Sequence, residues 1–383
     1  VFFLLNRAPA PPGSAAGRHG TMAAGTAAAA EPSDEVEYPG VRWVKASYIL
    51  QCLQDGKPMP RCQELPAKAF GSLAEAVRVF AVTHPWLGRW HPDPEGIQME
   101  TLRAFLQKLK KQMMLDHTDV VFFDYMSLPQ VNLAGVDDRT AEEKRRMAQA
   151  LSGDLMGRIY LTTRVVIIDE VPKDAESSKA YLDRGWCYFE CMVASMSTRP
   201  RDLSWLEART KQEIGEFRGL AAQFRENGDL APIREAFDKA LPSKAFANPA
   251  DARLVRGFFG SLAKSQRLIA AAAAGNVGDV TSALDDGADP RSRNGQGRTG
   301  LQVAALNGRV GAVAAILRRV DASVALMKTM ENETTLQMAI DGSSRECQVL
   351  IRSKIGESFP PLILPAIEGD EAGLEELLGD LGE

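Results

Sequence analysis

The sequence has few of the cysteine and histidine patterns that mark secreted or metal-binding proteins. Its five cysteines, at positions 52, 62, 187, 191 and 347, are irregularly spaced and leave an odd count. That pattern argues against a disulfide framework and is typical of a reducing compartment, so we expect a cytoplasmic protein. Cys187 and Cys191 share a helix face, but no further Cys or His completes a four-ligand set. We therefore expect no metal site.

Long apolar runs and a strong charge excess are also missing. No run reaches the roughly 18 apolar residues of a membrane span. The formal net charge of −5 is small and spread along the chain. We therefore expect neither membrane insertion nor nucleic-acid binding. A hydrophobic content of 45% and a charged content of 25% are ordinary for a globular protein, and 383 residues allow two or three domains.

The first 37 residues contain mostly Ala, Gly, Pro and Ser, with almost no large apolar side chains after Leu5. Such a composition cannot bury a core, so we predict that residues 1–37 are disordered. The apolar start, Val1 to Leu5, is either the tail of a signal peptide or translated upstream sequence, and Met22 as a plausible start favours the second interpretation for residues 1–21.

Strands and helices alternate in the next part of the chain. Apolar runs at 77–82, 119–124 and 164–168 predict three strands, and amphipathic stretches between them predict helices. Asp93 before Pro94 predicts one helix start, and Thr140 with Glu143 predicts a capping box at another. The β-α-β-α-β-α order predicts an α/β domain over 38–199 with a parallel sheet. In such sheets ligands bind beyond the carboxyl ends of the strands.

Two further segments follow this domain. Residues 200–266 have helical patterns and predict an extension that covers the sheet, without chemistry of its own. Residues 267–383 are repetitive: Leu268, Leu301 and Leu336 begin similar segments 33 and 35 positions apart (301 − 268 and 336 − 301). A period of about 33 residues is that of ankyrin repeats. A shorter copy at 362–378 would end the array, which makes about three and a half repeats.

The repeats resemble the ankyrin family at their helix starts. Thr299-Gly300-Leu301-Gln302 and Thr334-Thr335-Leu336-Gln337 stand where that family has Thr-Pro-Leu-His. The resemblance implies an all-α solenoid that binds a protein partner through its hairpin tips and concave face. The contact residues that we expect are Asn294, Asn307, Arg309 and Asn332.

The α/β part resembles the TIR domain and the fungal heterokaryon-incompatibility (HET) domain. Thr83-His84 stands where TIR domains have Ser-His at a strand end, and Trp186-Cys187-Tyr188-Phe189-Glu190 matches their Trp-Cys-x-x-Glu helix. The segments 124–130, Met156 to Tyr160 and Arg184-Gly185-Trp186 are similar to HET motifs. The resemblance covers about a third of the chain. It implies a TIR-like, flavodoxin-like fold and a role in signalling, with self-association through this domain.

The resemblance also implies an alternative function, cleavage of the nicotinamide–ribose bond of NAD by Glu190, with NAD as a substrate and no resident cofactor. A fixed carboxylate would stabilise the oxocarbenium-like ribose. The residues expected to bind the nucleotide are His84, Trp86, Asp124, Ser127, Arg184 and Trp186. Purely structural roles stay open: Glu190 in a structural or self-association role, His84 as a satisfied strand-end histidine, Trp86 as packing, and Asp124 as a loop cap.

Overall fold

The computed structural model describes residues 37–53, 57–197, 219–224, 230–329 and 331–356 of the 383-residue chain. The predicted disordered segment, except Glu37, lies outside these ranges. So do residues 200–218 and 225–229 of the predicted helical extension, and the predicted terminal repeat copy at 362–378.

A five-stranded mixed sheet forms the centre of the first part, in the order β2-β1-β4-β3-β5. Strands β3, β4 and β5 correspond to the three predicted strands and pair in parallel. β1 pairs antiparallel with both β2 and β4. The expectation of a parallel sheet is therefore correct for the central three strands and wrong for the edge. The bounds are β1 (Trp43–Lys45), β2 (Phe70–Gly71), β3 (Val79–Thr83), β4 (Val120–Phe122) and β5 (Arg164–Ile167).

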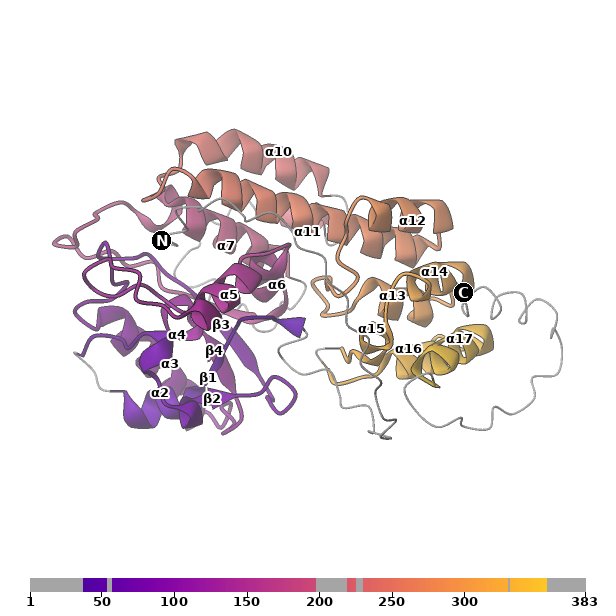
Figure 1. The fold of residues 1–383 in the computed structure, drawn as a ribbon, viewed down its shortest axis with the longest axis horizontal. Coiled ribbons are helices and arrows are strands. Elements are labelled where there is room, and N and C mark those ends of the chain that lie inside the picture. Colours follow the sequence, from indigo (N-terminus) through magenta and orange to yellow (C-terminus); the bar gives the residue numbers. More distant parts are fainter. Residues whose placement is uncertain (1–36, 54–56, 198–218, 225–229, 330, 357–383) are drawn as a thin grey trace, which may run out of the picture.

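Helices cover both faces of this sheet (Figure 1). Successive residues of a strand point to opposite faces, so Phe80 and Val82 pack with one helical layer, while Val79 and Ala81 pack with the other. The first layer contains α2 (Ala46–Cys52) and α3 (Ile97–Lys111). The second contains α5 (Ala141–Ala150), α6 (Leu155–Thr162), α7 (Gly185–Ser195), α10 (Ala231–Ala240) and the first half of α11 (Asp251–Ala274). The short helix α4 (Asp124–Ser127) follows β4 directly.

Both predicted capping sites exist, although one helix starts later than predicted. Thr140 and Glu143 form the capping box of α5. Asp93 accepts hydrogen bonds from the backbone N–H groups of Gln98 (3.0 Å) and Met99 (2.8 Å) in the first turn of α3. However, α3 begins at Ile97, so Pro94 is not its first residue. The carboxylate caps the helix from a preceding loop.

Paired helices form the second part of the molecule. The second half of α11 pairs with α12 (Val277–Asp285), α13 (Gly300–Leu306) with α14 (Val310–Leu317), and α16 (Thr335–Asp341) with α17 (Arg345–Gly356). Each pair packs on the next and encloses a core of Ala, Leu and Val. Tight hairpins precede α13 and α16, with bridges Arg293↔Thr299 and Lys328↔Thr334, and α15 (Ala322–Leu326) lies before the second hairpin.

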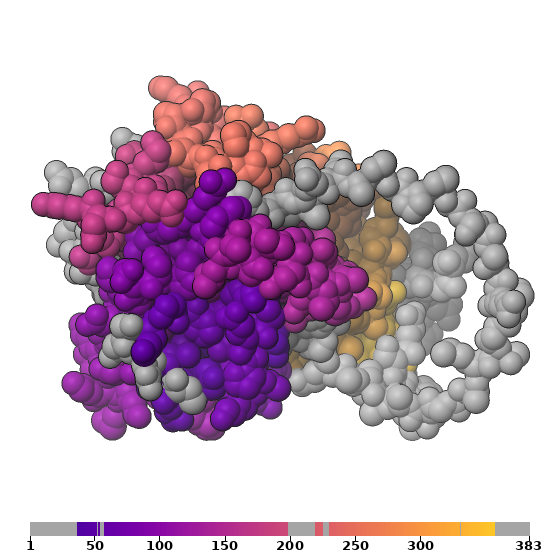
Figure 2. Space-filling view, turned by 60° about the vertical axis from the view of Figure 1, so that its left-hand side comes forward, coloured from indigo at the N-terminus to yellow at the C-terminus, as the bar shows by residue number. Residues whose placement is uncertain are grey.

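Helix α11 joins the two parts. Its first half packs on α6 and α7, and its second half is the first helix of the helix pairs, so the predicted boundary between residues 266 and 267 falls inside one continuous helix. In Figure 2 the α10–α11 region, coloured salmon, lies over the indigo to magenta surface of the α/β part. Within the described ranges, no helix combines the length and apolar character needed to span a bilayer.

Candidate functional site

Six of the seven residues predicted for the site surround one cavity of about 300 Å³ at the carboxyl edge of the central strands. They come from the end of β3, the start of α4 and the start of α7: His84, Trp86, Asp124, Arg184, Trp186 and Glu190. Ser127 is not part of the lining. It is fully buried, and its Oγ accepts a hydrogen bond from the backbone N–H of Phe123 at 3.1 Å, so it holds the turn after β4.

Glu190 lies among hydroxyl groups in the cavity wall. Thr83 Oγ1 donates to Glu190 Oε2 at 2.5 Å, and the hydroxyl of Tyr181 lies 2.7 Å from the same Thr83 oxygen. Burial raises the pKa of Glu190 to about 8, and hydrogen bonds from Thr83 and Tyr160 only partly oppose that rise. Glu190 is therefore mostly protonated in the free protein at neutral pH.

Asp124 has the opposite charge state. Its Oδ1 lies 2.8 Å from His84 Nε2, and its Oδ2 accepts the indole N–H of Trp86 at 2.9 Å. Burial by itself would raise the pKa of Asp124, but the charge of His84 and these hydrogen bonds outweigh it and hold the pKa at about 2. The cavity therefore contains the ionised carboxylate of Asp124 together with the mostly neutral carboxyl group of Glu190. Such a separation of two carboxyl pKa values is the usual basis of acid–base chemistry at pH 7.

His84 has one ring nitrogen engaged and one without a partner. Nε2 faces Asp124, and the ring packs on Phe123 with centroids 4.2 Å apart. Nδ1 is buried and makes no hydrogen bond within the described structure. Buried polar atoms normally have partners. His84 lines the cavity, although its Nδ1 itself is buried.

The predicted nucleotide-binding side chains Arg184 and Trp186 mainly hold the cavity wall. The guanidinium of Arg184 donates to the carbonyl oxygens of Trp86 (2.8 Å), Ser177 (2.8 Å) and Lys179 (3.0 Å). Trp186 Nε1 donates to Asp251 Oδ2 at 3.0 Å, at the start of α11. Trp86 and Trp186 are both less than a tenth exposed, so most of their ring surface already contacts protein.

Sequence reasoning missed several parts of the lining, among them Gly88 and Arg89, the segment 176–179, and the segment Ala245 to Ala247. The backbone of this last segment pairs with the start of α7: Ala245 N donates to Asp183 O at 2.7 Å, and Gly185 N donates to Ala245 O at 2.9 Å. A Cβ atom at Gly185 would lie 1.9 Å from the Phe246 ring. The glycine at the start of a predicted helix was the available signal, because it marks close approach of another group. It could not indicate which segment approaches.

The four residues predicted to contact a protein partner have contacts inside the chain. Asn294 Oδ1 accepts from the backbone N–H groups of Gln296 (3.0 Å) and Arg298 (3.1 Å) in the first hairpin. Asn307 and Arg309 both donate to the carbonyl oxygen of Ala273, at 3.4 and 3.2 Å, which ties α13–α14 to α11. Asn332 is in the second hairpin with a φ of 66°, and its backbone N–H donates to the carbonyl oxygen of Thr329 at 3.0 Å.

Comparisons with protein-family models, with curated proteins and with solved structures found no match. Among the described residues, no group of three or more His, Cys, Asp or Glu side chains is arranged to hold a metal ion. The four cysteines whose side chains are described, Cys62, Cys187, Cys191 and Cys347, are buried and form no disulfide with one another. The functional argument therefore depends on the residues of this chain and on the physical chemistry of its cavities.

Proposed function

We propose that the α/β part hydrolyses the nicotinamide–ribose bond of NAD, with Glu190 as the catalytic carboxyl group. The observation that carries this proposal is the position of Glu190 in one cavity with His84, Trp86 and Asp124, at the carboxyl edge of parallel strands. The resemblance to TIR and HET motifs points to Glu190, His84 and Asp124 independently of the cavity, whereas Trp86 belongs to neither motif. A cavity of about 300 Å³ is large enough to enclose a nicotinamide riboside end of a dinucleotide.

The lining of the cavity contains the cations Arg89, Lys179 and Arg184 as well as the carboxyl groups of Asp124, Glu176 and Glu190, which suits the anionic diphosphate and the cationic ring of NAD. Ionised Asp124 gives the empty cavity a negative group, and the nicotinamide ring of NAD carries a positive charge. A cation next to Glu190 lowers its pKa, so substrate binding favours the carboxylate that the reaction needs. Glu190 then stabilises positive charge on the ribose in the transition state, where that charge is greatest.

The reaction balances without a cofactor. The C1′–N bond breaks and its electron pair stays on the ring nitrogen, so nicotinamide leaves as a neutral molecule. Water adds to C1′ and loses a proton, which yields ADP-ribose.

Measuring nicotinamide release from NAD by the purified full chain tests this proposal. The assay covers a range of protein concentrations, because the resemblance to TIR domains implies that activity depends on self-association. We expect release by the wild type and a loss of at least about a hundredfold in Glu190→Gln, a neutral isostere. Glu142→Gln, an exposed carboxylate on α5, is the matched control and should equal the wild type. Equal release by Glu190→Gln and wild type, or none at any concentration, would remove the proposal.

A second function is favoured by the helix pairs. We infer that they form an ankyrin-like array that binds a protein partner, because three helix pairs stack in register and two are preceded by hairpins. Val277 and Ile340 are apolar side chains on this stack with 42% and 44% of their surface exposed. Replacing both by Asp should abolish capture of a partner that the wild type retains, while leaving NAD cleavage unchanged. Retention of the partner by the double variant would contradict a role for these two side chains in partner binding.

A further inference from the structure

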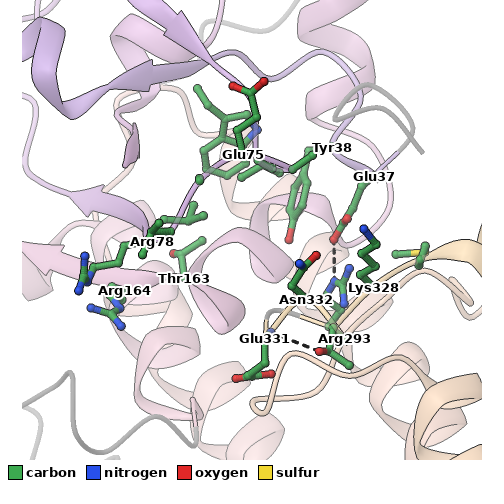
Figure 3. A pocket seen from close by; sticks show the side chains of 18 of the residues that line it. Glu37, Tyr38, Glu75, Arg78, Thr163, Arg164, Arg293, Lys328, Glu331 and Asn332 are labelled. Atoms are coloured by element: carbon green, nitrogen blue, oxygen red, sulfur yellow. Dashed lines mark hydrogen bonds and ion pairs between the residues drawn. The ribbon is translucent and has the colours of Figure 1, made fainter. Parts of the chain in front are cut away.

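Two cavities of the molecule differ in how their walls are held. The larger, of about 450 Å³, lies between the first residues of the central strands, beside Trp43, and the hairpins of the helix pairs (Figure 3). There the buried side chain of Arg293 joins the two sides, since its Nε lies 2.6 Å from Glu37 Oε1. The Glu190 cavity shares no lining residue with it and is bordered by residues 169–180, which form neither helix nor strand. We call residues 169–180 the strap.

Both ends of the strap are anchored on Thr83. Ile168, the residue before it, is buried and donates its backbone N–H to Thr83 O at 3.0 Å. Tyr181, the residue after it, is also buried, and its hydroxyl lies 2.7 Å from Thr83 Oγ1. Surface loops of roughly 6–16 residues whose ends lie close together are frequently functional. The fixed ends of the strap therefore meet at the residue that donates to Glu190.

The strap itself has no buried side chain. Each of its residues is exposed or half-buried. Segments with few buried apolar contacts open at a low cost in free energy. Three strap residues, Glu176, Ser177 and Lys179, nevertheless line the Glu190 cavity. The strap can therefore move away from the cavity without disturbing a hydrophobic core.

Arg184 holds the strap in place. Its guanidinium donates to the carbonyl oxygens of Ser177 (2.8 Å) and Lys179 (3.0 Å) on the strap. The same group donates to the carbonyl oxygen of Trp86 at 2.8 Å, after the end of β3. A planar guanidinium can hold several acceptors at once because its N–H groups form a rigid fork. One side chain therefore joins the strap to the wall behind it.

Glu176 makes a second attachment. Its Oε2 accepts the backbone N–H of Arg89 at 2.7 Å. The other walls of the cavity have firmer contacts: Trp186 donates to Asp251, and the ring of Phe246 packs against the start of α7. Movement of the strap therefore changes access to the cavity while these walls stay in place.

We propose that the strap is a gate for the Glu190 cavity and that Arg184 is the positioning residue that keeps it closed. The gate opens when water replaces the carbonyl groups of Ser177 and Lys179 on Arg184, and it pivots at Ile168 and Tyr181. In its closed position it excludes water, which strengthens the electrostatic interactions around Glu190. As regulation of NAD cleavage this inference rests on the proposed function, whereas as control of access to the cavity it does not.

Cys187 provides a probe of the gate that needs no NAD. It lines the cavity, whereas Cys191, one turn further along α7, is also buried but lies outside the lining. The full chain is treated with methyl methanethiosulfonate, a small neutral thiol reagent, at one fixed pH. Mass spectrometry then gives the modification rate of each cysteine. In the wild type we expect Cys187 to react faster than Cys191.

Arg184→Lys should raise the modification rate of Cys187 about tenfold and leave that of Cys191 unchanged. Lysine keeps the positive charge beside Cys187, but it lacks the planar fork that holds the carbonyl groups. Glu176→Ala removes the second attachment and should raise the rate at Cys187 about threefold. Asp174→Ala is the matched control, because it removes one exposed carboxylate from the strap outside the lining, and it should equal the wild type.

Acceleration at Cys187 alone, in either variant, supports the gate. An unchanged rate at Cys187 in both variants would overturn it. Equal acceleration at Cys187 and Cys191 would also overturn it, because it would mean that α7 unfolds locally. Should Arg184→Lys fail to fold, Glu176→Ala still tests the gate, since Glu176 is exposed. A chain that shows the expected labelling but releases no nicotinamide would keep the gate and lose the proposed NAD cleavage.

Discussion

Thr83 at the end of β3 donates its hydroxyl hydrogen to Glu190 on α7 over 2.5 Å, although 107 positions separate the two residues. Tyr181 completes the arrangement, since its hydroxyl lies 2.7 Å from the Thr83 oxygen. The Thr83 hydroxyl has a single hydrogen. Because it donates that hydrogen to Glu190, the Tyr181 hydroxyl must be the donor in its own bond to Thr83. The strand, the turn before α7 and α7 itself are joined by this chain of hydroxyls.

Replacing Thr83 by Val should raise the pKa of Glu190 further above its present value of about 8, because the hydrogen bond from Thr83 lowers it. The shift should be on the order of one pH unit. Carbon-13 NMR titration of the Glu190 carboxyl group measures it. Thr83→Ser retains the hydroxyl and should titrate like the wild type, and an unchanged pKa in Thr83→Val would show that the hydroxyl does not govern Glu190.

Glu190 should make the protein less stable as pH rises. The folded protein keeps the Glu190 proton up to about pH 8, whereas the unfolded chain releases it near 4.5. The folded state therefore binds more protons between these values, and the free energy of unfolding falls as pH increases from about 4.5 to about 8. The loss attributable to Glu190 is on the order of 5 kcal/mol.

Urea unfolding of the wild type and Glu190→Gln at several pH values checks this dependence. The neutral variant should lack the loss, so its stability relative to the wild type should increase steadily from pH 5 to pH 8. Glu142→Gln serves again as the exposed control. Parallel curves for Glu190→Gln and wild type would mean that Glu190 is already ionised in the folded protein.

Asp124 should have the reverse pH dependence. Its pKa is held at about 2, so the stability that it contributes is present above its ordinary value of 3.8 and disappears as pH falls through about 2. Asp124→Asn should cost about 3–5 kcal/mol at pH 7, because it leaves His84 without a carboxylate in a buried site. The difference from the wild type should shrink only below about pH 4. Guanidinium unfolding from pH 3 to pH 7 measures this difference in stability. Trp86→Phe is the comparison variant, because it removes the indole N–H that donates to Asp124 but keeps the charge of Asp124.

Gly185→Ala should displace the segment that closes the Glu190 cavity. The new methyl group would lie 1.9 Å from the Phe246 ring, so the ring and its segment must move. We expect a cost of about 1–3 kcal/mol, typical of overpacking. Adding Phe246→Ala to the Gly185→Ala variant should restore most of the lost stability. A double-mutant cycle by urea unfolding gives the coupling energy, and additive effects of the two changes would place the cost elsewhere.

Several local features could be predicted because the residues that make them are close in sequence. The three central strands have continuous apolar runs, as strands buried on both faces do. The capping box of Thr140 and Glu143 requires only a three-residue spacing. Met113 shows the limit of this reasoning: it continues the apolar spacing of α3 but is 92% exposed, because α3 ends at Lys111.

Helix α7 shows why periodicity alone could not define the site. All of its residues from Gly185 to Ser195 are buried, so no polar face indicates which side chains meet the cavity. Sequence spacing also pairs Trp186 with Glu190 on one face. In the folded chain Trp186 bonds to Asp251 and Glu190 bonds to Thr83, two partners from distant segments.

The sequence by itself determined the order of the central strands and helices, the two capping carboxylates and the identities of six residues in the Glu190 cavity. These follow from local hydrogen bonding, local periodicity and short motifs. Only the tertiary structure decided the antiparallel edge of the sheet, the wall made by Phe246, the opposite charge states of Glu190 and Asp124, and the second cavity beside Trp43. Each of these depends on burial or on contacts between segments far apart in the chain, and residue spacing contains no information about either.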